Sequence, residues 1–111
     1  MDIQTRKEAK ASVLTLSGRM DAVTAPAFEA TVRQLIESGS VSFVVDFQRV
    51  EYISSAGLRA LLATAKLQKN SGGQIRLAAI TGSVKEVFDI SGFGSIFQMH
   101  DTTENALAAL A

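Results

Sequence analysis

The chain has 111 residues with eleven basic and eleven acidic side chains, so its length fits one domain and its formal net charge is zero. The absence of basic runs argues against nucleic acid or an anionic membrane as partner, and the absence of cysteine excludes disulfides and Cys-ligated metals. The 47% hydrophobic content is enough to form a core, but no run approaches the ~18 apolar residues that would span a bilayer. The first seven residues also lack the apolar stretch of a signal peptide. We therefore expect a cytoplasmic protein without membrane insertion.

The first half of the chain predicts strands and a helix in alternation. A β-prone segment at 12–16 predicts a strand, and 2–6 is a candidate partner for it. Thr24 is a candidate N-cap, and apolar residues at helical spacing predict an amphipathic helix that ends at Gly39. The nearly continuous apolar run 41–47 is typical of a central parallel strand that is buried on both faces.

The second half continues the alternation. Helical spacing begins at Leu58 and ends within 70–73, and strands are predicted at 75–79 and 96–99. Two capping-box patterns predict the starts of two further helices. They are Ser83 with Glu86, before a short helix that Gly92 ends, and Asp101 with Glu104, before a final helix. The order predicts an α/β fold over residues 1–111, with a small, mostly parallel sheet of four to five strands flanked by about four helices.

The junction before the second long helix is the most informative candidate site. Ser54 and Ser55 precede this helix, and one of them is expected to be its N-cap. Both serines could have only this capping role. Alternatively, one hydroxyl faces solvent beside the first-turn N–H groups, where anions are favoured, and Gly57 lets another backbone or a phosphate come close.

Other constellations point away from catalysis. The single histidine, His100, is not accompanied by a G-x-S-x-G elbow, and the sequence contains no nucleotide-binding glycine motif, so neither a hydrolase nor a cofactor is indicated. Asp46 ends an apolar strand as a phospho-acceptor aspartate would, but no acidic pair follows the first strand. We therefore expect a structural or interface role for Asp46, and a binding module rather than an enzyme.

Four segments together resemble the STAS-domain anti-sigma-factor antagonists, and the likeness is collinear over essentially the whole chain. They are Gly18-Arg19-Met20-Asp21, Asp46-Phe47 followed by Val50, Tyr52-Ile53-Ser54-Ser55-Ala56-Gly57-Leu58, and Val84-Lys85-Glu86-Val87-Phe88-Asp89-Ile90-Ser91-Gly92. The segment around Ser55 is the specific one, whereas the glycine-to-aspartate turn alone is weak.

The resemblance implies a partner-switching regulator. Such a protein, when unphosphorylated, binds an anti-sigma factor that is also a serine kinase of the histidine-kinase-like ATPase fold, and so releases a sigma factor or another client. Phosphorylation of the serine that matches Ser55 would abolish this binding, and a PP2C-type phosphatase would reverse it. Many relatives have aspartate where this chain has Ser54 and serine or threonine where it has Ala56, which leaves Ser54 as the rival acceptor.

The resemblance also implies which residues contact the partner. These are Asp21, Asp46, Ser54, Ser55, Ala56, Gly57, Leu58 and Arg59. Asp21 could equally be a solvated or capping carboxylate, and Arg59 could simply belong to the exposed helix face. The alternative function is that of a STAS accessory subunit in a transport or signalling assembly that is not controlled by serine phosphorylation.

Overall fold

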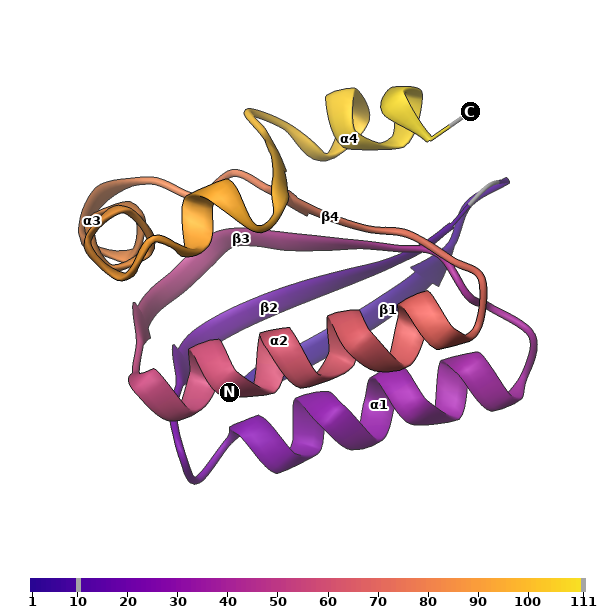
Figure 1. The fold of residues 1–111 in the computed structure, drawn as a ribbon, viewed down its shortest axis with the longest axis horizontal. Coiled ribbons are helices and arrows are strands. Elements are labelled where there is room, and N and C mark those ends of the chain that lie inside the picture. Colours follow the sequence, from indigo (N-terminus) through magenta and orange to yellow (C-terminus); the bar gives the residue numbers. More distant parts are fainter. Residues whose placement is uncertain (10, 111) are drawn as a thin grey trace.

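The computed structural model describes residues 1–9 and 11–110, which form one five-stranded sheet flanked by helices (Figure 1). The strands are β1 (Asp2–Lys7), β2 (Ser12–Met20), β3 (Phe43–Ile53), β4 (Ile75–Ala78) and β5 (Gln98–His100). The helices are α1 (Ala25–Glu37), α2 (Ser55–Asn70), α3 (Gly82–Ser91), the 3-10 turn η1 (Phe93–Ser95) and α4 (Thr103–Ala109). The strands lie in chain order, with β1 antiparallel to β2 and the rest parallel, so the predicted α/β fold with a mostly parallel sheet is confirmed.

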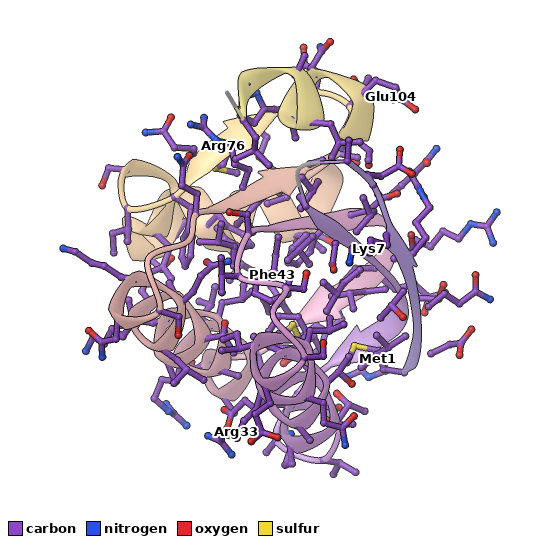
Figure 2. All side chains as sticks on the ribbon, turned by 90° about the vertical axis from the view of Figure 1, so that its right-hand side faces the viewer. Met1, Lys7, Arg33, Phe43, Arg76 and Glu104 are labelled. Carbon is purple, nitrogen blue, oxygen red and sulfur yellow. The ribbon has the colours of Figure 1, made fainter. Side chains whose placement is uncertain are left out.

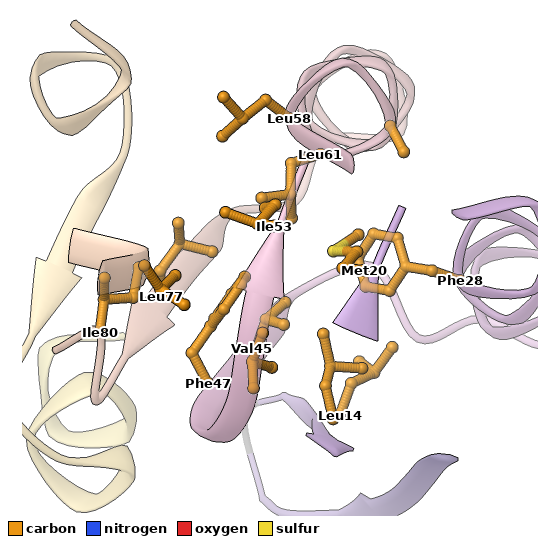
Figure 3. Packing of buried hydrophobic residues seen from close by; sticks show 14 of the residues in the cluster. Leu14, Met20, Phe28, Val45, Phe47, Ile53, Leu58, Leu61, Leu77 and Ile80 are labelled. Carbon is orange, nitrogen blue, oxygen red and sulfur yellow. The ribbon is translucent and has the colours of Figure 1, made fainter. Parts of the chain in front are cut away.

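The two faces of the sheet are covered unequally. Helices α1 and α2 lie side by side on one face, and the short helix α4 lies on the other (Figures 1 and 2). Figure 3 shows the larger core, in which Leu14, Val45 and Leu77 from three neighbouring strands pack with residues of α1 and α2. The smaller cluster packs Val13, Val44 and other small apolar residues against α4. Burial of apolar area on both faces makes β3 the central strand, as its sequence predicts.

Strand β3 differs most from its prediction, because it begins at Phe43 and continues to Ile53. Beyond Phe47 the buried residues are Val50 and Ile53, a spacing of three that fits no regular strand. Two register shifts against β2 explain this spacing. Between the pairs Thr15–Asp46 and Ser17–Arg49, β3 has one residue more than β2. A second extra residue of β3 lies between the pairs Gly18–Val50 and Arg19–Tyr52. Each bulge turns the next apolar side chain back toward the core.

Several element boundaries also differ from the predictions. Both capping boxes are wrong: α3 follows Thr81 rather than Ser83, and α4 is capped by Thr102, which accepts a hydrogen bond from the Asn105 N–H at 3.0 Å. Runs of adjacent residues that can cap, such as Asp101-Thr102, leave the helix start uncertain by one or two positions. The last strand begins two residues later than predicted because η1 occupies Phe93–Ser95. Gly39 and Gly92 end their helices with positive φ, as predicted.

A buried glutamine ties α2 to the sheet. Gln68 is 1% exposed, and its Nε2 donates to the carbonyls of Val41 and Gln74 at 2.7 and 2.6 Å. These carbonyls lie just before β3 and β4, so one side chain connects the C-terminal half of α2 to the starts of two strands. No helix in the described ranges is both long and apolar enough to cross a membrane.

Replacing Gln68 tests this link. Gln68→Leu keeps the volume but removes the donor from the Val41 carbonyl, whereas the Gln74 carbonyl still accepts from the Phe43 N–H at 2.8 Å. We expect this change to lower the free energy of unfolding by about 1–2 kcal/mol. Urea denaturation measures the loss. Gln34→Leu, on the exposed face of α1, is the matched control and should stay within about 0.5 kcal/mol of the parent. Equal effects of the two changes would contradict the assigned role.

Candidate functional site

The two serines before α2 have different roles. Ser54 is the N-cap: its backbone is extended, and its Oγ accepts a hydrogen bond from the Gly57 N–H at 3.2 Å. Ser55 is the first residue of the helix, and its side chain is exposed. Capping, which the sequence could assign to either serine, therefore occupies the Ser54 hydroxyl and leaves the Ser55 hydroxyl facing solvent at a helix N-terminus.

The start of α2 is held against the end of β2 by backbone contacts. The Ser54 N–H donates to the Met20 carbonyl at 2.9 Å. A Cβ on Gly57 would lie 2.6 Å from the same oxygen and 2.8 Å from Cγ1 of Ile53, distances that no real Cβ tolerates. Of the two uses predicted for Gly57, the structure shows the close approach of another backbone.

The other predicted residues of this segment point in different directions. Leu58 is 6% exposed and belongs to the larger core, and Gly57 is buried as well, so neither presents a side chain to a partner here. Ala56 is half-buried, and Arg59 is exposed one turn into the helix. The accessible part of the segment therefore consists of Ser55 and Arg59, with Ser54 and Ala56 partly accessible.

Asp21 organises the turn between β2 and α1. Its Oδ1 accepts hydrogen bonds from the N–H groups of Val23 and Thr24, at 3.0 and 3.1 Å. The hydrogen bond from the Thr24 N–H is the largest cause that holds the pKa of Asp21 below its usual value, and burial opposes it. The Val23 N–H, the Thr24 hydroxyl and the Arg19 charge lower the pKa further, each by less. The Asp21 carboxylate thus closes the turn that leads into α1, whose N-cap position is occupied by Thr24 as predicted. Asp21 follows directly on the strand end that contacts Ser54.

Three exposed side chains of this edge were not assigned a role from the sequence. The guanidinium carbon of Arg19 lies 4.2 Å from the centre of the Tyr52 ring, and its Nε is 3.8 Å from Asp21. Val23 is 87% exposed beside them, which is unusual for a large apolar side chain. The pairing of Arg19 with Tyr52 depends on the second register shift, which no sequence periodicity reveals.

Asp46 does not join this edge. Asp46 follows Val45, whose side chain faces α1 and α2, and it precedes the first bulge of β3. The Asp46 side chain lies on the α4 side of the sheet. There its Oδ1 accepts a hydrogen bond from the Gln48 N–H at 2.9 Å. The predicted contact residues thus divide into an edge around Ser55, which includes Asp21, and a separate position at Asp46.

Known proteins resemble this chain along nearly its whole length. The STAS domain family model matches residues 2–106. The "Putative anti-sigma factor antagonist BtrV" of Bordetella bronchiseptica is 38% identical over 97 residues, which is 87% of this chain and 84% of that protein. An anti-sigma factor antagonist from Mycobacterium paratuberculosis has a crystal structure that superposes with a TM-score of 0.87 at 27% identity, covering 98% of this chain and 92% of that one.

A more distant likeness concerns the fold alone. The Bacillus cell fate determinant SpoIIAA, in its phosphorylated form, superposes with a TM-score of 0.76 at 21% identity, covering 99% of this chain and all of that chain. The matches confirm the family resemblance drawn from the sequence.

Gly57→Ala tests the backbone contact at the start of α2. The added Cβ would push the helix away from the Met20 carbonyl, and we expect a loss of about 1–3 kcal/mol, as for other overpacked sites. Ala63→Gly, at an exposed position of the same helix, is the control for helix propensity. Amide shifts of Met20 and Ser54 should move in Gly57→Ala, and unchanged shifts with unchanged stability would contradict the contact.

Asp21 should make stability depend on pH. Its folded-state pKa is lowered, so its contribution is present above the unfolded pKa of about 4 and is lost as the pH falls through the folded value. Asp21→Ala should therefore have a lower Tm than the parent at neutral pH, with a difference that narrows below about pH 4. Glu37→Ala, an exposed carboxylate at the end of α1, controls for net charge. A Tm difference that stays constant down to acid pH would rule out this role of Asp21.

Proposed function

The chain belongs to the STAS domain family, and we propose that it is an anti-sigma factor antagonist: a binding regulator that captures an anti-sigma factor while unphosphorylated and releases it when Ser55 is phosphorylated. Relatives named anti-sigma factor antagonists support the general role. The observation that supports the switch is the exposed Ser55 hydroxyl at the N-terminus of α2, beside a Ser54 hydroxyl that is already used as the cap.

The position of Ser55 suits a phosphate that leaves the domain folded. A phosphoserine adds about 1.5 to 2 negative charges and three acceptor oxygens. The first turn of α2 is Ser-Ala-Gly-Leu, so it places no acidic side chain near the new charge, and a helix N-terminus favours anions. Phosphorylation at this place should therefore stabilise the helix slightly rather than melt it.

The effect of the phosphate should instead appear at the interface with the partner. A dianion that is buried against another protein without compensating groups loses its hydration, which costs several kcal/mol. A loss of about 3 kcal/mol already lowers affinity more than a hundredfold. The proposed off state is thus a folded domain whose docking surface carries a charge that the partner does not accommodate.

The remaining components of the proposal follow from the family. The partner would be an anti-sigma factor with serine kinase activity and a histidine-kinase-like ATPase fold, a PP2C-type phosphatase would remove the phosphate, and both would meet this chain in the cytoplasm. Because Ser54 stands where many relatives have aspartate, no carboxylate precedes the acceptor here. The general base would then have to come from the kinase.

Capture of the kinase-fold partner from the source cell tests the switch. Immobilised parent and Ser55→Ala should both retain the partner, whereas Ser55→Asp should lose most of it, because the carboxylate carries part of the phosphate's charge to the docking surface. Ser54→Asp is the matched control: aspartate caps helices as well as serine does, so it adds a charge one residue away without losing the cap, and it should still bind.

Phosphate incorporation identifies the acceptor. With the captured kinase and ATP, the parent should gain one phosphate by intact mass, and Ser55→Ala should gain none. Stoichiometric phosphorylation of Ser55→Ala would instead assign the acceptor to Ser54. Amide shifts of the phosphorylated parent should change only around the start of α2. If no kinase phosphorylates the parent and Ser55→Asp binds as well as the parent does, the accessory-subunit alternative is favoured.

A further inference from the structure

The strand β1 forms a free edge of the sheet. Within the described part of the chain it pairs with β2 alone, and Figure 2 shows it between the labels of Met1 and Lys7, at the margin of the molecule. Its six residues pair with β2 without a register shift, and they include no proline. Bulges, prolines and covering elements are common means by which proteins keep an edge from pairing with another chain. The edge of β1 is therefore a regular row of backbone groups that is open to a further strand.

The turn after β1 determines which backbone groups face outward. The Glu8 N–H donates to the Ala11 carbonyl at 2.8 Å, so these two residues form a hydrogen-bonded pair of the antiparallel β1–β2 ladder. Hydrogen-bonded pairs recur at every second residue, which directs the backbone groups of the even-numbered residues of β1 toward β2. The N–H and C=O groups of Ile3, Thr5 and Lys7 therefore point away from the sheet, where a second strand can pair with them.

The side chains of β1 are complementary to a second, antiparallel copy of the same strand. A two-fold axis at Gln4 places Asp2 of each copy opposite Arg6 of the other. In this register the outward backbone groups of Ile3 pair with those of Thr5. Asp2 and Arg6 are both exposed and lie on the same face of the strand, because side chains alternate along it. Since the axis repeats the contact, two pairs of opposite charge meet at non-hydrogen-bonded positions, where facing side chains are closest.

The same charges disfavour the neighbouring registers. Because outward backbone groups recur at every second residue, the two copies can shift only in steps that keep this alternation. A shift in one direction brings Asp2 opposite Glu8 of the second copy, so that like charges face each other. A shift in the other direction brings Asp2 opposite Gln4 and shortens the paired segment. The Arg6 Nε lies 3.8 Å from the Glu8 carboxylate of its own chain, but the Arg6 side chain is 51% exposed and remains accessible to a second carboxylate.

We infer that two copies of this chain associate through their β1 strands into one continuous sheet, with Asp2 of each copy paired with Arg6 of the other. Because β1 is antiparallel both to β2 and to the second β1, the β2 and β3 strands of the two copies run in opposite directions. The two helix starts at Ser55 then face opposite ways along the strands, and both stay free. Such a dimer can hold two partner molecules, and its formation does not depend on phosphorylation of Ser55.

The small size of the contact limits the strength of the association. A strand of six residues is about 20 Å long, so one strand pair buries less than the ~1,200 Å² at which standard interfaces begin. We therefore expect a reversible dimer that forms at high protein concentration and dissociates on dilution.

Sedimentation velocity of the full chain between about 10 µM and about 1 mM tests the inference. The parent should change from monomer to dimer over this range. Asp2→Arg and Arg6→Asp should each weaken dimerisation about tenfold, because each variant places like charges opposite one another. An equimolar mixture of the two variants should regain the dimer as a heterodimer, since every arginine then faces an aspartate. Glu86→Lys, at an exposed position of α3, is the charge-reversal control and should dimerise as the parent does.

A proline variant separates the strand edge from other surfaces. Thr5→Pro removes one outward N–H group, and proline is tolerated on an edge strand where this group faces solvent. The variant should stay folded by circular dichroism and monomeric throughout the same range. A parent that is monomeric at every concentration would overturn the inference. So would a dimer that survives Thr5→Pro, which would use another surface or an exchanged strand. If Thr5→Pro does not fold, the charge variants still decide, because their failure to form the heterodimer excludes this pairing.

Discussion

The contact between the Met20 carbonyl and the start of α2 determines the geometry of the proposed switch site. The Ser54 N–H donates to this oxygen, and Gly57 packs against it without a side chain between them. Because backbone atoms form both sides of the contact, the distance from strand to helix depends on the missing Cβ rather than on the rotamers of neighbouring residues. This contact fixes where the helix begins. It thereby determines that Ser54 caps the helix and that Ser55 faces outward.

The same strand end brings a second turn to this edge. Asp21 follows Met20 directly and closes the turn into α1 through the N–H groups of Val23 and Thr24. Chain connectivity therefore places the turn and the helix start together. Asp46 faces the other layer because side chains alternate along β3. One short domain thus has two chemically different surfaces: an edge with exposed Val23 and Ser55, and a polar cavity lined by carboxylates.

Local sequence patterns predicted the element order, the central position of β3 and the helix that follows the two serines, because periodicity and glycine stops are local properties. They did not predict the extension of β3 to Ile53, since its three-residue spacing arises from bulges that form only against β2. They left open which serine caps α2, because the choice depends on the Met20 contact, which joins residues far apart in the chain. The resemblance also could not predict that Asp46 and Ser55 lie on different surfaces. It shows which residues match the family, but not on which face of the sheet each side chain lies.

The arrangement also explains why docking, rather than folding, is the property that a phosphate on Ser55 would change. A modification can shift an equilibrium only as far as it interacts differently with the two states. In the free domain the new charge would meet solvent and a helix N-terminus, both of which accommodate it. In a complex it would lose that solvent, whereas the core beneath it, with Leu58 already buried, would be the same in both states. The difference in the free energy of phosphorylation between the free and the partner-bound domain therefore arises almost wholly at the interface. Such a switch requires a rigid contact between the end of β2 and the start of α2, because this contact keeps Ser55 on the docking surface.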